Sequence, residues 1–301
     1  MKFDVVTFGS AVVDTFVSTD VAEKKGFMEY KVGEKLLIRD LKFDIGGAGT
    51  NTAVAFSRLG LKTGCITKLG EDNNGKDILK NLEDEGVEYL GRTVKHKLSG
   101  YSIVLDSKGG DRTILTYKGV NNEIEIKDIK NFKTKWLYLS SLMGKSFETQ
   151  KKVATILKKR GTKIAFNPSS YLIKTENLDR LLKICDIVVL NKEEARMLVG
   201  NREKDLLKGM GKLTDAIAVI TDKDKLISCS QGHRRYVLMP NKNVKVVERT
   251  GAGDAFASGF VAGQIAGRTV PESLILGLME SEAVITNFGA KNNLIKMRLR
   301  R

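Results

Sequence analysis

The chain has 301 residues, of which 42% are hydrophobic and 29% charged, a composition typical of a folded globular protein and not of a disordered one. Its formal net charge is +15, but the lysines are dispersed along helical faces, so we expect a solvated surface and no nucleic-acid partner. The length favours one large α/β core with a small appendage over two independent domains.

The start of the chain and its cysteines indicate a cytoplasmic protein. The first residues lack the basic flank and the long apolar run of a signal peptide, and no run of about 18 apolar residues follows, so no membrane partner is expected. Cys65, Cys185 and Cys229 are odd in number and far apart, which fits neither a disulfide framework nor a Cys-x-x-Cys metal or redox motif. A reducing compartment suits such thiols best.

Short apolar, β-branched runs alternate with amphipathic stretches along the chain. The predicted strands lie at 3–8, 65–69, 136–139, 163–166, 187–190 and 216–220. The predicted helices between them include 51–60, 75–86, 146–161 and 193–200, each closed by a glycine. This alternation predicts a doubly wound α/β fold, in which a mostly parallel sheet is flanked by helices on both faces.

Two regions break the alternation, at about residues 15–42 and 93–120, and their patterns predict strands and hairpins, the second with a turn at 106–111. Both leave the main sheet, so we expect them to meet as a small β-sheet lid inserted into a core that spans 1–301. No internal repeat or linker suggests a second domain. Exposed lid strands favour pairing with a second copy, so a homodimer through the lid is a hypothesis.

A glycine-rich segment with Gly46, Gly47 and Gly49 precedes Asn51 and a predicted helix. Small residues let a ligand touch the backbone, and the Asn51 amide, with both donor and acceptor, suits the hydroxyls of a polyol. A dinucleotide-binding turn is a weaker alternative, because a third glycine is missing and residues 39–45 make a poor buried strand. No Walker A lysine follows, which excludes the P-loop class.

A second small-residue turn, formed by Gly251, Ala252, Gly253 and Asp254, lies between a predicted strand at 244–248 and a predicted helix. Unpaired backbone N–H groups at a helix N-terminus, with the helix dipole, bind anions such as phosphate, and glycines allow close approach. A carboxylate there can accept the proton of an attacking hydroxyl while the amides stabilise a transferring phosphoryl group. The alternative is that Asp254 only caps the helix.

These two segments together, in this order, resemble the two signatures of the ribokinase (pfkB) family of carbohydrate and nucleoside kinases, and the resemblance spans nearly the whole chain. It implies a doubly wound α/β core with a β-sheet lid. It further implies transfer of the terminal phosphoryl group of a nucleotide, with ATP as the expected donor and Mg²⁺ as the cofactor, to a hydroxyl of a sugar or nucleoside.

The resemblance also assigns site residues. The family's catalytic base falls on Asp254, and its anion hole on the amides of Gly251, Ala252 and Gly253. Its acceptor-binding positions fall on Asp14, Gly46, Gly47 and Asn51, with Arg112 of the lid and Asn167 of an Asn-Pro turn as further candidates. Solvation at the surface is an equal alternative for Arg112.

On the nucleotide side, the family's Asn-x-x-Glu motif falls on Asn191, near the phosphates, and Glu194, which contacts Mg²⁺ through water. Without the resemblance, Asn191 and Glu194 would be read as the first turn of a helix. Thr221, Gly253 and Asn287 are the other expected nucleotide contacts.

The chain departs from the family pattern at positions that bear on its substrates. Relatives carry Thr-x-Gly-x-x-Gly where charged residues replace both glycines at 221–226 here, which leaves the donor nucleotide open. Glu248 stands in place of an aspartate, which weakens the inference of a monovalent-cation site. Ser140 and Ser141 replace an acidic sugar contact of some ribokinases, which leaves ribose itself open as the acceptor. Arg112 and the net positive charge favour a sugar-phosphate acceptor as an alternative, and the altered 221–226 turn favours a non-catalytic sugar or nucleotide sensor.

Overall fold

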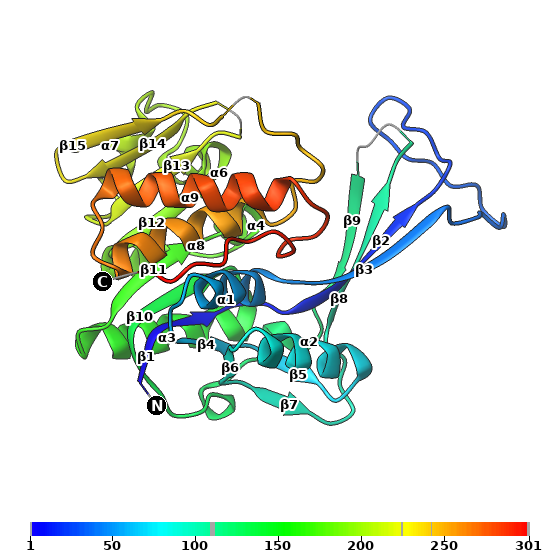
Figure 1. The fold of residues 1–301 in the computed structure, drawn as a ribbon, viewed down its shortest axis with the longest axis horizontal. Helices are drawn as coiled ribbons and strands as arrows, with labels where there is room; N and C mark the ends of the chain where they lie inside the picture. Colours follow the sequence, from blue (N-terminus) through cyan, green and yellow to red (C-terminus); the bar gives the residue numbers. More distant parts are fainter. Residues whose placement is uncertain (1, 109–111, 224, 242, 300–301) are drawn as a thin grey trace.

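The computed structural model describes residues 2–108, 112–223, 225–241 and 243–299. A large α/β body carries a thin β-sheet arm that projects from one side (Figure 1). Within the described ranges, no helix is both long and apolar enough to cross a membrane.

The body is built on a nine-stranded sheet with the order β15-β14-β13-β12-β11-β10-β1-β4-β6. Its strands are β1 (Lys2–Phe8), β4 (Thr63–Ile66), β6 (Glu88–Tyr89), β10 (Lys133–Ser140), β11 (Lys163–Asn167), β12 (Ile187–Asn191), β13 (Ile217–Thr221), β14 (Ile227–Gln231) and β15 (Arg234–Leu238). Every pairing from β13 to β6 is parallel, and only β14 and β15 are antiparallel. The carboxyl ends of the parallel strands therefore share one edge.

Helices cover both faces of this sheet. They are α1 (Ala48–Arg58), α2 (Asn73–Asp84), α3 (Gly144–Lys159), α4 (Ser170–Thr175), α5 (Asp179–Ile184), α6 (Lys192–Val199), α7 (Leu206–Met210), α8 (Ala252–Ile265) and α9 (Val270–Ile285), with the short 3-10 helices η1 (Gly119–Asn122) and η2 (Ile126–Asp128). Val5 and Val6, adjacent in β1, are both fully buried and belong to opposite hydrophobic cores. A parallel strand covered on both faces has this pattern, and the predicted doubly wound fold is confirmed.

The arm is the predicted lid, a four-stranded sheet with the order β3-β2-β8-β9. Its strands are β2 (Val12–Ser18), β3 (Asp40–Gly46), β8 (Gly100–Asp106) and β9 (Arg112–Tyr117), and a separate pair joins β5 (Lys68–Gly70) to β7 (Arg92–Val94). The two regions predicted to leave the main sheet, at about 15–42 and 93–120, thus both supply strands of the lid. Residues 109–111 of the turn predicted at 106–111 lie outside the described residues.

The strand predicted at 244–248 is wrong, because this segment runs along the end of α9 and joins no sheet. The backbone N–H groups of Val247 and Glu248 both donate to the Ile285 carbonyl, at 2.8 and 3.3 Å. Val246 and Val247 are 42% and 55% exposed, so their β-branched side chains gain little from burial here. The segment instead connects β15 to α8 and passes the C-terminal end of α9 on the way.

One carboxyl group is buried away from the candidate site, between α9 and the C-terminal segment. Glu280 on α9 is fully buried, and its Oε2 accepts a 3.3 Å hydrogen bond from the Ile295 N–H. Its Oε1 has no hydrogen-bond partner in the described part of the chain. Burial raises the pKa of Glu280 to about 7, so the neutral form is favoured in the folded protein.

Glu280→Gln should remove a pH-dependent loss of stability. Since the pKa of Glu280 rises from 4.5 to about 7 on folding, the native state binds the proton more tightly, and its free energy of unfolding falls as pH rises through that window. The loss amounts to about 3 kcal/mol at about 1.4 kcal/mol per pKa unit. Urea unfolding at several pH values should show Glu280→Gln similar to wild type near pH 5 and more stable at pH 8.

The control for this experiment is Glu282→Gln on the same helix, where the side chain is half-buried and accepts a 2.8 Å hydrogen bond from the Asn241 N–H. This variant should keep the wild-type dependence of stability on pH. A Glu280→Gln protein that loses stability above pH 5 as steeply as wild type would contradict the assignment.

Candidate active site

The turn before α8 presents unpaired backbone N–H groups. Gly251 caps the helix with φ +80°, a left-handed conformation that favours glycine, and a Cβ there would lie 2.7 Å from the Ala290 Cα. Among the described residues, the N–H groups of Gly251 and Gly253 have no hydrogen-bond acceptor, whereas Ala252 donates to the Arg249 carbonyl at 3.3 Å. Two of the three predicted amides are therefore free for an anion at the positive end of the helix dipole.

Asp254 lies in the first turn of α8 and contacts the first glycine-rich segment. Asn51 Nδ2, on α1, donates a 2.9 Å hydrogen bond to Asp254 Oδ2. Burial raises the pKa of the Asp254 carboxyl, against the Asn51 hydrogen bond and the charge of Lys291, which lower it. The buried Oδ1 of Asn51 has no hydrogen-bond partner in the described chain and can accept a hydrogen bond from a hydroxyl group.

Asp14 approaches the same region from the lid. It lies on β2 opposite Asp44 of β3, and a Cβ on Gly46 would lie 1.9 Å from Asp14 Oδ2. Glycine at 46 thus leaves the space that the Asp14 carboxylate occupies. Gly47 has φ +95°, and a Cβ there would lie 2.6 Å from the Ser10 carbonyl oxygen, so this tight turn also needs glycine.

Two cations that the sequence analysis missed, buried Lys291 and exposed Lys118, lie near these carboxylates. Lys291 is 3% exposed, and its Nζ donates to the Ile45 carbonyl. Burial lowers the pKa of Lys291 to about 8, although Asp44 and Asp14 act to raise it. Desolvation likewise lowers the pKa of Lys118, whereas the negative charge of Asp14 acts to raise it. No local motif marks either lysine, because their partners come from distant parts of the chain.

Arg112 links the lid to the segment before α8. Its guanidinium forms an ion pair with Glu248 and a 3.0 Å hydrogen bond to Thr250 Oγ1. Burial acts to raise the pKa of Glu248, but hydrogen bonds from Thr250 and Arg112 hold it below its usual value. Glu248 also accepts a 3.3 Å hydrogen bond from the Gly289 N–H. The charge of Arg112 is therefore engaged by protein groups.

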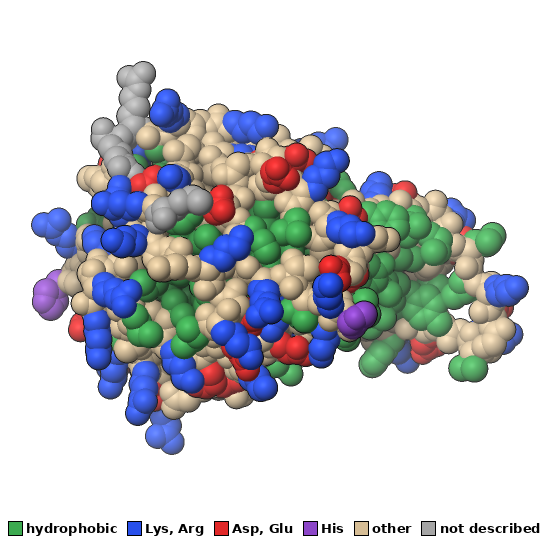
Figure 2. Space-filling model, turned by 90° about the horizontal axis from the view of Figure 1, so that it is seen from below, with side chains coloured by type: hydrophobic (Ala, Val, Ile, Leu, Met, Phe, Trp, Pro, Cys, Tyr) green, Lys and Arg blue, Asp and Glu red, His purple; other side chains and the backbone are tan. Residues whose placement is uncertain are grey.

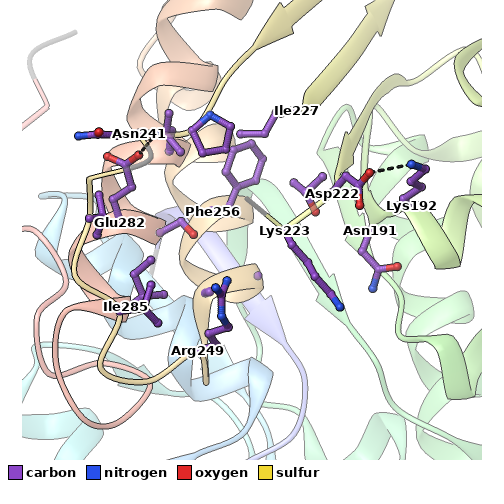
Figure 3. Close-up of a pocket in the computed structure, with 18 of the residues that line it drawn as sticks. Asn191, Lys192, Asp222, Lys223, Ile227, Asn241, Arg249, Phe256, Glu282 and Ile285 are labelled. Atoms are coloured by element: carbon purple, nitrogen blue, oxygen red, sulfur yellow. Dashed lines mark hydrogen bonds and ion pairs between the residues drawn. The ribbon is translucent and has the colours of Figure 1, made fainter. Parts of the chain in front are cut away.

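Beside the α8 N-terminus lies a cavity of about 720 Å³, which we call the α8 pocket (Figure 3). Its apolar lining is Ile227, Pro240, Val244, Val246, Ala252, Phe256, Leu278 and Ile285, and its polar lining is Asn191, Lys192, Glu193, Thr221, Asp222, Lys223, Asn241, Arg249, Gly253, Ser281 and Glu282. A volume of this order, with apolar walls and a few polar groups, is typical of a site for a small organic molecule.

The predicted Asn-x-x-Glu motif forms a helix cap at the edge of this pocket. Asn191 Oδ1 accepts from the Glu194 N–H and Glu194 Oε2 from the Asn191 N–H, both at 2.8 Å. Glu194 Oε1 accepts from the Ser170 N–H at 3.1 Å, and burial raises the pKa of Glu194. No group of three metal-ligating His, Cys, Asp or Glu side chains occurs in the described ranges. A single carboxylate fits a Mg²⁺ ion held mainly by phosphate and water oxygens.

The predicted nucleotide contacts are only partly brought together. Asn191, Thr221 and Gly253 line the α8 pocket. Asn287 is exposed just after α9, where its Oδ1 accepts a 2.8 Å hydrogen bond from the Phe288 N–H, and it does not line the pocket. Asn167, which was predicted as an acceptor contact and not as a nucleotide contact, lies at the end of β11 and donates at 2.8 Å to the Val189 carbonyl.

Known proteins match both the sequence and the fold. A model of the pfkB family carbohydrate kinases matches residues 2–297. The ribokinase of Haemophilus influenzae is 26% identical over 278 residues, which cover 88% of each chain. The structure of Arabidopsis thaliana ribokinase complexed with ribose and ATP has a TM-score of 0.82 at 22% identity, covering 98% of this chain and 96% of that one.

A third similar protein is an adenosine kinase of Sinorhizobium meliloti, whose crystal structure has a TM-score of 0.82 at 20% identity and covers 97% of this chain and 96% of that one. These structures confirm the ribokinase-like fold with its lid. With a family model matched over almost its whole length, the chain belongs to the pfkB family of carbohydrate kinases.

Proposed function

We propose that this kinase transfers the terminal phosphoryl group of ATP to a hydroxyl of a sugar or nucleoside, with Mg²⁺ as cofactor. The observation that carries this proposal is the arrangement at the start of α8, where the Asp254 carboxylate lies beside the free N–H groups of Gly251 and Gly253. These are the groups that phosphoryl transfer needs, since one accepts a proton and the others stabilise charge on the transferring phosphoryl group.

The acceptor binds on the lid side of Asp254. Asp14 and the unpartnered Oδ1 of Asn51 accept hydrogen bonds from its hydroxyl groups, and Gly46 and Gly47 let it approach the backbone. Asp254 Oδ1, which is not bonded to Asn51, takes the proton of the attacking hydroxyl. A carboxyl whose pKa is raised by burial is a better base than one in water.

In the chemical step, the acceptor oxygen forms a bond to the terminal phosphorus, the bond to the bridging oxygen breaks, and the nucleoside diphosphate leaves. The N–H groups of Gly251 and Gly253 donate to the oxygens of the transferring group. Mg²⁺, when bound with the nucleotide, supplies further neutralisation of phosphate charge, with Glu194 contacting it through water. The nucleotide itself occupies the α8 pocket, with Asn191, Thr221 and Gly253 as contacts.

A sugar-phosphate acceptor is the second candidate, favoured by the cations Lys118 and Lys291 near Asp14. Arg112 is already paired with Glu248, and Lys291 is buried and donates to the Ile45 carbonyl, so a phosphate would compete with both contacts. We therefore favour a neutral acceptor. A non-catalytic sensor is disfavoured, because Asp254 and the free amides would then have no use.

We also propose a homodimer through the lid and a cytoplasmic location. On one face of the lid, Thr15 of β2 pairs with Phe43 of β3 and with Ile103 of β8, and Ile103 pairs in turn with Leu115 of β9. The side chains of Phe43 and Leu115 are 63% and 53% exposed. The opposite face carries Asp14. Hydrophobic side chains gather on the arm in Figure 2, whereas basic ones are scattered over the body.

The three cysteines are buried free thiols, which suits a reducing compartment.

The function is tested by a coupled phosphorylation screen of sugars, nucleosides and sugar phosphates against ATP, GTP and ADP. We expect one neutral acceptor to dominate with ATP. Strong activity on a phosphorylated acceptor alone would instead establish the second candidate. Failure of every acceptor with every donor would overturn the kinase assignment of the site.

Asp254→Asn should lower turnover by roughly 10² to 10⁴, because the neutral amide cannot take the proton of the acceptor. Steady-state kinetics with the best acceptor from the screen measures this, and an unchanged melting temperature shows that the fold is kept. Asp77→Asn, at an exposed position of α2, is the matched control and should keep wild-type activity. Near-wild-type turnover in Asp254→Asn would refute the role of this carboxylate.

Gly46→Ala should lower kcat/KM for the acceptor by about 10- to 100-fold, since its Cβ would lie 1.9 Å from Asp14 Oδ2 and must displace that carboxylate. The KM for ATP should stay the same. At Gly211, an added Cβ would meet its nearest atoms at 3.6 and 3.7 Å, so Gly211→Ala serves as the control. Unaltered acceptor kinetics in Gly46→Ala would mean that Asp14 does not hold the acceptor.

Phe43→Asp should convert a dimer to a monomer, because a charge at the centre of the apolar lid face opposes its burial against a second copy. Light scattering after size-exclusion chromatography measures the mass of both proteins. Val237→Asp places the same charge at a 63% exposed position of β15 and should leave the mass unchanged. A monomeric wild-type protein at micromolar concentration would rule out the lid dimer.

A further inference from the structure

The loop after β13 places a lysine in a backbone conformation that side chains seldom adopt. Lys223 has φ +49°, in the left-handed region that favours glycine. It lines the α8 pocket, and in the view of Figure 3 its ammonium end lies on the side of Asn191, across from Arg249. A lysine held in this way needs a use for its charge at that position.

No acid among the described residues forms an ion pair with Lys223. The adjacent Asp222 is bound to Lys192, with Asp222 Oδ2 2.7 Å from the Lys192 Nζ. No carboxylate oxygen of the described residues lies within ion-pair distance of Lys223. Within the described part of the loop, the pocket-lining acid Asp222 is therefore paired with Lys192 of α6, and Lys223 is left unpaired at the cavity.

Arg249 brings a second unpaired cation to the same cavity from the other side. It directly precedes the turn at 250–253, lines the α8 pocket and is exposed. Its carbonyl accepts the Ala252 N–H at 3.3 Å, but its guanidinium forms no ion pair with any described residue. The nearby Glu248 is already occupied by Arg112. Two free cations thus flank the end of the pocket that opens onto Gly253.

We propose that Lys223 and Arg249 bind the polyphosphate tail of the donor nucleotide from opposite sides and hold it against the α8 N-terminus. This inference rests on the proposed function, because it assumes a nucleotide in the α8 pocket. An arginine fork can bind two phosphate oxygens at once, and a lysine ammonium acts as a point charge. Both add to the free N–H groups of Gly251 and Gly253.

The opposite end of the pocket has a different chemistry, which fixes the direction of the nucleotide. Away from Arg249, Phe256 and Ile227 supply apolar surface, and Glu282 brings a negative charge that would repel phosphates (Figure 3). A base therefore suits the end at Phe256 and Ile227, and a tail suits the end between Lys223 and Arg249. Affinity should accordingly increase with the number of phosphates on the ligand.

The test is calorimetric binding of ATP, ADP, AMP and adenosine, and of GTP and guanosine, to the whole protein with no sugar present, and displacement by ATP identifies the nucleoside that is bound in the α8 pocket. Lys223→Met and Arg249→Met remove each charge and keep most of the side-chain length. Each change should weaken triphosphate binding about five- to twentyfold, as the loss of a charge-assisted contact predicts, and leave nucleoside binding unchanged. The penalty should decrease in the order triphosphate, diphosphate, monophosphate, and it should shrink at high salt.

Matched controls come from the same two loops. Lys225→Met and Lys245→Met remove exposed lysines that do not line the pocket, and both should bind ATP as wild type does. Unchanged ATP affinity in both Lys223→Met and Arg249→Met would overturn the inference. So would an equal loss of ATP and adenosine affinity, or a wild-type protein that binds neither triphosphate.

The two proposals fail in different ways. Suppose that the variants lose the increase in affinity with phosphate number, but the wild type phosphorylates no acceptor. The phosphate-binding roles of Lys223 and Arg249 then stand, and the proposed function fails. If the wild type is an active kinase and the variants keep the wild-type KM for the donor, only the roles of Lys223 and Arg249 fail.

Discussion

The site depends on the close contact between α1 and α8, which the hydrogen bond from Asn51 to Asp254 makes specific. Val54 and Ala55 of α1 pack directly on Ala255 of α8, so small side chains let the two helix starts approach. Both helices begin at glycines with positive φ, Gly47 and Gly251. The geometry that packs the helices therefore also turns both glycine-rich segments toward one space.

The proposed acceptor side includes the lid, which holds half-buried charge that the core must balance. Asp14 and Asp44 face each other across β2 and β3, and burial raises the pKa of both. Lys291, from the segment after α9, supplies the opposing charge and binds the Ile45 carbonyl. Arg112 adds a second link, from β9 to Glu248. Lid position and charge balance in the site are thus coupled, because lifting the lid would leave buried charges without their partners.

Sequence reasoning succeeded where the signal was local. Alternating apolar runs predicted the sheet, and glycines beside Asn51 and Asp254 predicted the segments that meet. It failed at 244–248, where a β-branched run pairs with the Ile285 carbonyl in place of a strand. Lys291 and Asp44 escaped notice because their contacts join distant segments, and the unpaired state of Lys223 follows only from seeing Asp222 bound to Lys192.

The two sides of α8 differ in which charges lack a partner, and this difference bears on how substrates would be ordered. Carboxylates of Asp14, Asp44 and Asp254 lie on the proposed acceptor side, where Lys291 and Lys118 offset them in part, whereas Lys223 and Arg249 line the α8 pocket with no ion pair to a described residue. A polyphosphate is attracted to these two cations, and the free N–H groups of Gly251 and Gly253 lie between the two sides. The terminal phosphoryl group would therefore stop at the boundary, within reach of a hydroxyl bound at Asp254.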